Sequence, residues 1–142
     1  MPAIELDESL CGLSLKMGCV VASVVYISYG SIFLTAEVVS PVYVDENPDV
    51  NEACHYLNLV NNGLSMLLGV LLLVAALVEN KISLFICLII WGIHILTRMV
   101  VALLITMHMG FFVGIHVIVG FVAIISVFLY FGLIIYSYYK KL

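Results

Sequence analysis

Four long stretches with at most one charged side chain each are the feature of this sequence that most limits its fold. At about 1.5 Å per residue, a helix of each length crosses a hydrocarbon core of about 30 Å. Unpaired backbone groups are not tolerated in lipid, and these stretches are continuously apolar rather than alternating, so they predict helices and not barrel strands. The predicted fold is an all-α, four-helix transmembrane bundle, with helices over residues 17–37, 57–78, 82–105 and 111–136.

Composition leaves little room for anything outside the membrane. Of the 142 residues, 65% are hydrophobic and only 10% are charged. We therefore expect a single four-pass domain over residues 1–142, in which the longest connection is an outer loop at 38–56. This composition excludes an ordinary soluble enzyme.

The basic residues predict the orientation of the bundle. Lysines at 16, 81, 140 and 141 all fall on one side of the four spans, whereas the outer loop carries four acidic residues and no lysine or arginine. By the positive-inside rule, both termini are expected to be cytoplasmic. The net charge of −4 argues against binding to nucleic acid and leaves the lipid bilayer and other membrane proteins as expected partners.

Several polar residues lie inside the predicted spans. Counting along the helices at about 1.5 Å per residue places Arg98 about 24 Å, and Glu37 about 30 Å, from the inner edge, so the two are predicted to pair. His94 shares a helix face with Arg98 because it precedes it by four residues. The predicted intramembrane cluster in the outer half comprises Glu37, Asn61, Asn62, His94, Arg98 and His116.

Two interpretations of this cluster remain open. Intramembrane ionisable residues are typical of an ion or proton pathway, or of a small-ligand pocket that opens outward. Alternatively, the cluster is a hydrogen-bonded pin that fixes helix packing, with Arg98 paired to Glu37 or to carboxylates of the outer loop.

No catalytic residue and no cofactor is assigned, because the chain has no nucleotide-binding, metalloprotease or nucleophile-elbow motif. The four histidines form no i, i+4 pair, so no metal site is predicted. Cys54 is the only cysteine of the outer loop and is expected to be a buried thiol or a cross-link between two copies. Cys11 and Cys19 flank the inner membrane face and are candidates for acylation.

Two short patterns suggest contacts with other helices or proteins. Gly110 and Gly114 form a GxxxG motif that predicts close helix packing within the chain, with a homo-oligomer as the alternative. The C-terminal residues Tyr139 and Leu142 fit the tyrosine-based pattern that sorting adaptors bind, and this predicts an endolysosomal route.

The segment 11–18, CGLSLKMG, places a cysteine and a Lys-x-Gly step directly before the first span. It resembles the small arthropod four-pass proteins of the Pasiflora and Fire exit group and, more remotely, the lysosome-associated four-pass proteins. The resemblance implies a multipass protein of epithelia or glia, with some relatives in septate junctions, and no catalytic residues.

Taken with this resemblance, our first hypothesis is a non-enzymatic scaffold or accessory subunit in cell-junction assembly. A component for transport of ions, protons or small solutes and an endolysosomal sorting adaptor are the alternatives. The plasma membrane is the expected location, with the endolysosomal membrane as the alternative.

Overall fold

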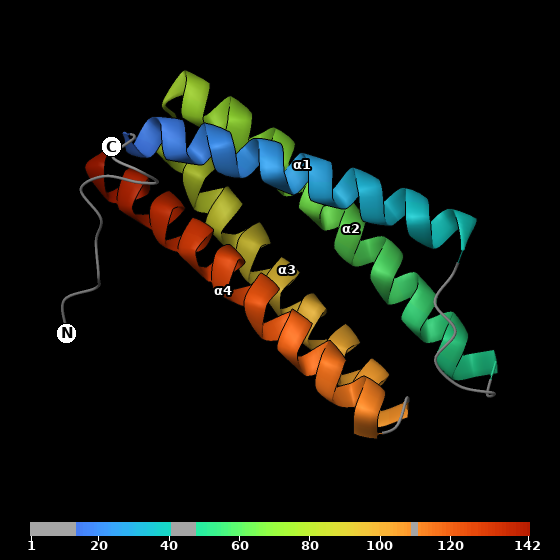
Figure 1. Ribbon diagram of the computed structural model, residues 1–142. Helices are drawn as coiled ribbons and strands as arrows, with labels where there is room; N and C mark the ends of the chain where they lie inside the picture. Colours follow the sequence, from blue (N-terminus) through green and yellow to red (C-terminus); the bar gives the residue numbers. More distant parts are fainter. Residues whose placement is uncertain (1–13, 41–47, 109–110) are drawn as a thin grey trace.

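The computed structural model of the chain consists of four long helices that run alternately up and down (Figure 1). The structure describes residues 14–40, 48–108 and 111–142, and among these the side chains of all but 111–114. All four helices are long and apolar enough to cross a bilayer, which confirms the predicted fold class and makes the chain an integral multipass membrane protein. The helices are α1 (Leu15–Val39), α2 (Pro48–Val78), α3 (Lys81–His108) and α4 (Phe111–Lys141).

The second helix begins earlier than the hydropathy pattern predicts. It starts at Pro48 instead of at residue 57, so half of the predicted outer loop 38–56 is helical. Proline suits the first turn of a helix because its ring fixes φ and it has no N–H group to leave unpaired, and Asp49 in the same turn interacts favourably with the helix dipole. Hydropathy located the apolar part of this helix and not its polar first turns.

A tight turn joins α2 to α3. Glu79 has a positive φ of 59°, and Asn80 caps α3 by accepting hydrogen bonds from the backbone N–H groups of Ile82 (2.9 Å) and Ser83 (3.2 Å). The Glu79 carboxylate lies 3.1 Å from the ammonium group of Lys16. The start of α1 is therefore tied to the turn between α2 and α3.

The four helices form a ring in which each one packs against its neighbours along the chain and α4 returns to α1. The most extensive contact is between α1 and α2, and two glycines allow it. A Cβ atom added to Gly30 of α1 would lie 2.7 Å from the carbonyl oxygen of Asn62, and one added to Gly69 of α2 would lie 2.8 Å from that of Ser23. Only glycine permits the two backbones to approach this closely.

One end of the bundle, the lysine end, contains Lys16, Lys81, Lys140 and Lys141. The half of the bundle next to it is closely packed. Aromatic and aliphatic side chains from all four helices meet there, and Tyr26 and Trp91 pack between helices. The lysines gather at one end as the loop charges predict, and their cytoplasmic location stays a prediction. Fully buried core residues include Cys19, Tyr26, Leu68, Leu72, Leu84, Cys87, Ile134 and Ile135.

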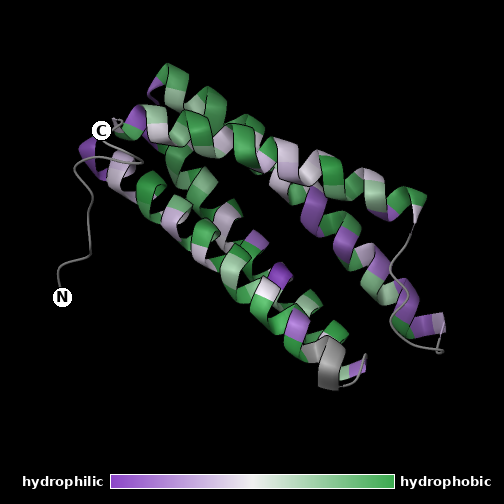
Figure 2. Ribbon diagram, viewed as in Figure 1, coloured by the Kyte–Doolittle hydropathy of each residue, from purple (hydrophilic) through white to green (hydrophobic). Residues whose placement is uncertain are grey.

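The other end, which we call the opposite end, is formed by the C-termini of α1 and α3 and the N-termini of α2 and α4. Figure 1 shows the α1–α2 pair and the α3–α4 pair separating toward it. No residue of α4 from Ile115 to Val127 is buried. Farther along the same helix, Phe128, Phe131, Ile134 and Ile135 are buried. Figure 2 shows hydrophilic residues concentrated in this half, above all along α2.

Candidate functional site

The six residues of the predicted polar cluster do not form one group in the structure. They divide into a Glu37 centre, which links α1 to α2, and an Arg98 centre, which links α3 to α2 and α1. His116 belongs with Arg98, because both side chains line one pocket between α3 and α4.

The Glu37 centre lies near the opposite end. The carboxylate of Glu37 is buried, with a residue exposure of 5%. Its Oε1 atom lies 2.9 Å from Nδ1 of His55, and its Oε2 atom accepts a hydrogen bond of 3.4 Å from the amide of Asn58. Cys54, one turn from Asn58 on α2, is fully buried, which confirms the buried thiol that the sequence predicts.

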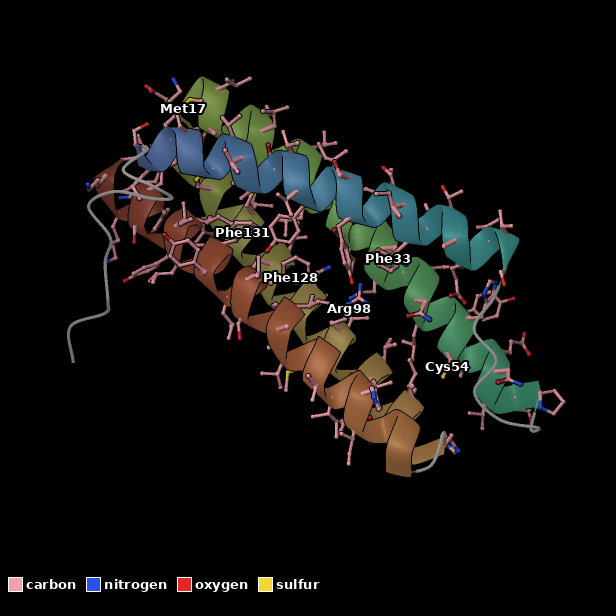
Figure 3. The ribbon with its side chains drawn as sticks, viewed as in Figure 1. Met17, Phe33, Cys54, Arg98, Phe128 and Phe131 are labelled. Carbon is pink, nitrogen blue, oxygen red and sulfur yellow. The ribbon has the colours of Figure 1, made fainter. Side chains whose placement is uncertain are left out.

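The Arg98 centre lies deeper in the bundle. Nη2 of Arg98 donates a hydrogen bond of 3.2 Å to the side-chain oxygen of Asn62, and the guanidinium carbon lies 5.1 Å from the centroid of the Tyr29 ring. The neighbouring Asn61 donates a hydrogen bond of 3.0 Å to the backbone oxygen of His94. Figure 3 shows Arg98 pointing into the space between the two helix pairs.

The predicted pair between Glu37 and Arg98 is wrong. Glu37 bonds to α2, and the described contacts of Arg98 are with Asn62 and the Tyr29 ring. On α1, Tyr29 lies eight residues before Glu37, which is about 12 Å along the helix axis. The counted depths of Arg98 and Glu37 already differed by about 6 Å, and counting along an axis does not show which neighbouring helix a side chain faces.

His94 is a buried polar side chain without a compensating bond. Its exposure is 0%, and its ring lies edge-on to Tyr26 (5.8 Å between centroids) and to Phe128 (5.3 Å). Neither ring nitrogen has a hydrogen-bond partner among the described residues, and the same holds for Oδ1 of Asn61 and Nε of Arg98. Each such atom costs about 1–3 kcal/mol, so this layer lowers stability and is a candidate for function.

The pocket beside Arg98 has a volume of about 220 Å³. It lies between the opposite-end halves of α3 and α4, and apolar side chains form most of its wall. Arg98 and His116 are its two basic residues. The lining residues are Arg98, Val101, Ala102, Ile105, His116, Val117, Gly120, Phe121 and Ile124.

An aromatic layer separates this polar region from the lysine end. Tyr26 stacks on Phe128 at 5.0 Å and meets Phe131 at 5.6 Å. The indole N–H of Trp91 donates a hydrogen bond of 2.9 Å to the Phe128 carbonyl, which fixes this layer between α3 and α4. Figure 3 shows Phe128 and Phe131 on the lysine side of Arg98.

The other predicted residues lie apart from these centres. Cys19 has an exposure of 0%, so its thiol is inaccessible to acylation in this conformation. Tyr139 lies within α4 with its ring 4.9 Å from the Lys81 ammonium, while Leu142 is exposed. Cys11 and Gly110 fall outside the described residues, and the surroundings of Gly114 are not described either, so the GxxxG motif stays a prediction. Within the described ranges, no group of three or more His, Cys, Asp or Glu could hold a metal ion.

Sequence reasoning missed three members of the two centres, His55, Asn58 and Tyr29. The signal for Asn58 was present in the sequence. Asn58, Asn61, Asn62 and Ser65 recur at helical spacing and form one polar stripe on α2, and all four lie within the predicted span 57–78.

Comparisons with protein-family models, with curated proteins and with solved structures give no match. Geometry and chemistry are therefore the basis for a functional assignment.

Proposed function

We propose that this chain is a non-enzymatic scaffold or accessory subunit of a membrane complex, acting through lateral contacts between its helices and another membrane protein. The observation that carries the proposal is the uncovered half of α4. No residue from Ile115 to Val127 is buried, although the same helix is well buried after Val127.

The surface of this half suits a second helix. Val119 and Val122 are 65% and 53% exposed, and a Cβ atom added to Gly120 would meet nothing within 4 Å. Helices associate in lipid through close van der Waals packing, which small and β-branched residues favour. Within the chain, the described ring contacts between α1 and α4 involve Phe128 and Phe131. None of these contacts reaches residues 115–127 of α4.

Site-specific photo-crosslinking in native membranes tests the proposal. A photoreactive residue at Val119 is expected to give a discrete protein adduct that is recovered in stoichiometric amount. Leu129 is the matched control, because it is on the same helix, 49% exposed, and in the half that the chain itself covers. Lipid adducts alone at Val119, or the same protein adduct at both positions, would contradict the proposal.

The identity of the crosslinked protein shows whether the chain acts in cell-junction assembly or as a homo-oligomer. Septate-junction proteins would support a place in cell-junction assembly at the plasma membrane, which rests on the resemblance of segment 11–18. An adduct of twice the chain mass would indicate a homo-oligomer instead.

A transport component is the second candidate, and the pocket beside Arg98 favours it. A basic residue in a pocket with a mostly apolar wall is an arrangement that fits a site for an anionic solute. Transport would require the aromatic layer of Tyr26 and Phe128 to open. Anion flux into liposomes that is lost with Arg98→Gln would support this candidate, and absence of flux for the purified chain would remove it.

A further inference from the structure

We propose that the pocket between α3 and α4 binds an anionic membrane lipid, with the headgroup oxyanion on Arg98 and an acyl chain along the apolar wall. This site goes beyond the proposed partner surface and does not depend on it. Gly120 belongs to both surfaces, but crosslinking at Val119 tests the partner and lipid binding to the Arg98→Gln variant tests the pocket, so each proposal can fail alone.

Charge is the first argument. The described contacts of the Arg98 guanidinium are a neutral amide, that of Asn62, and the ring of Tyr29, and its Nε has no hydrogen-bond partner within the described chain. A cation inside a membrane protein is costly unless an anion compensates it. The planar guanidinium matches the geometry of phosphate and carboxylate oxygens, and bonds to such oxyanions are about twice as strong as neutral ones.

Depth is the second argument. Arg98 follows Lys81 by 17 residues, so at about 1.5 Å per residue it lies about 26 Å along α3, within a hydrocarbon core of about 30 Å. With Lys81 at one interface, Arg98 lies close to the other. The headgroups of the adjacent leaflet are found at that level, so a lipid phosphate reaches the guanidinium with little displacement.

The apolar wall is the third argument, and it favours a lipid over a free anion. Apart from Arg98 and His116, the pocket is lined by side chains such as Val101, Ile105 and Phe121. These groups offer no hydrogen bonds to a hydrated inorganic anion, but they provide contact for an acyl chain. The pocket is open on one side, so a chain longer than its volume of about 220 Å³ continues into the bilayer.

Binding of a fluorescent phosphatidylglycerol to the purified full-length chain in non-ionic detergent tests the site. Unlabelled phosphatidylglycerol is expected to displace the probe, and phosphatidylcholine is not. Arg98→Gln is expected to weaken binding by about tenfold or more, as for loss of a hydrogen bond to a charged group. Lys140→Gln is the charge control and should leave affinity unchanged, because Lys140 is exposed at the lysine end and lines no part of this pocket.

A second variant fills the pocket without removing the charge. Gly120→Leu should also weaken lipid binding by about tenfold, roughly the contribution of a buried acyl segment of two methylenes. The Cβ atom of the new side chain meets no neighbour within 4 Å, so the substitution does not press on the backbone of another helix there. Gly92→Leu is the control, since Gly92 is equally open but is not a lining residue.

Size-exclusion profiles and helical circular dichroism establish that each variant is folded before binding is compared. Loss of binding with both Arg98→Gln and Gly120→Leu supports the lipid site. Unchanged binding in either variant overturns it. Displacement of the lipid by inorganic phosphate at millimolar concentration also overturns it, because the pocket would then hold a free anion.

Discussion

The two halves of this bundle are built on different principles. Next to the lysine end, apolar side chains from all four helices fill one core around Tyr26, Leu72 and Phe131. Toward the opposite end, α1 and α2 stay together through polar contacts of Glu37 with His55 and Asn58, and α4 has no buried side chain between 115 and 127. Close apolar packing is thus concentrated in one half, and the other carries the buried polar centres of Glu37 and Arg98.

The largest expected effect on stability comes from comparing two phenylalanines of the same helix. Phe131→Ala should lower the free energy of unfolding by about 3 kcal/mol, because Phe131 is only 4% exposed and its contacts with Tyr26 would be replaced by a cavity. Phe121→Ala removes the same side chain from the pocket wall and should cost less than about 1 kcal/mol. Equal losses, measured by reversible unfolding in micelles, would mean that both halves are packed alike.

Two glycines of α2 test the close contact with α1. Gly69→Val should destabilise the fold by about 2 kcal/mol, since a Cβ atom there would lie 2.8 Å from the Ser23 carbonyl oxygen and 2.9 Å from the Ile27 nitrogen. Gly63→Val, on the same helix with nothing within 4 Å, should be neutral or slightly stabilising. Thermal denaturation of the two purified variants gives the comparison, and a tolerated valine at 69 would show that the helices are farther apart.

A double-mutant cycle sharpens the division of the polar half into two centres. Glu37→Gln and His55→Gln should couple by about 1 kcal/mol, because the two side chains are 2.9 Å apart. Glu37→Gln and Arg98→Gln should be additive to within about 0.5 kcal/mol, because these residues belong to different centres. The reverse pattern of coupling, measured in the same unfolding assay, would restore the direct pair that the sequence suggested.

His94→Leu is expected to have the smallest effect, and an unusual one. Replacing a buried imidazole that has no described hydrogen-bond partner by an apolar side chain of similar volume should stabilise the fold by about 1 kcal/mol or leave it unchanged. His55→Leu is the contrasting change and should destabilise it, because it leaves the Glu37 carboxylate without its closest partner. A clear loss of stability with His94→Leu would show that its ring is bonded in the membrane.

Some features of this site could be predicted from sequence and others could not. Arg98, Asn61, Asn62 and His94 were identified from hydropathy, because a polar residue inside an apolar stretch is conspicuous. His55 was missed because it was assigned to the outer loop 38–56. Asn58 was missed although it lies inside the predicted span 57–78, because only Asn61 and Asn62 were taken from the polar residues of that span. Tyr29 was missed because an aromatic side chain in a span gives no signal that it will cover a guanidinium.

The sequence by itself determined the four spans, their alternation and the end at which the lysines gather, because each follows from hydropathy, chain length and the order of charges. Tertiary structure alone decided that Arg98 bonds Asn62 and not Glu37, that His94 is enclosed by Tyr26 and Phe128, and that the helix pairs separate around a pocket. The physical reason is that counting residues gives position along one helix axis. Contacts also depend on the relative shift, rotation and separation of neighbouring helices, and close packing at Gly30 and Gly69 sets these for α1 and α2.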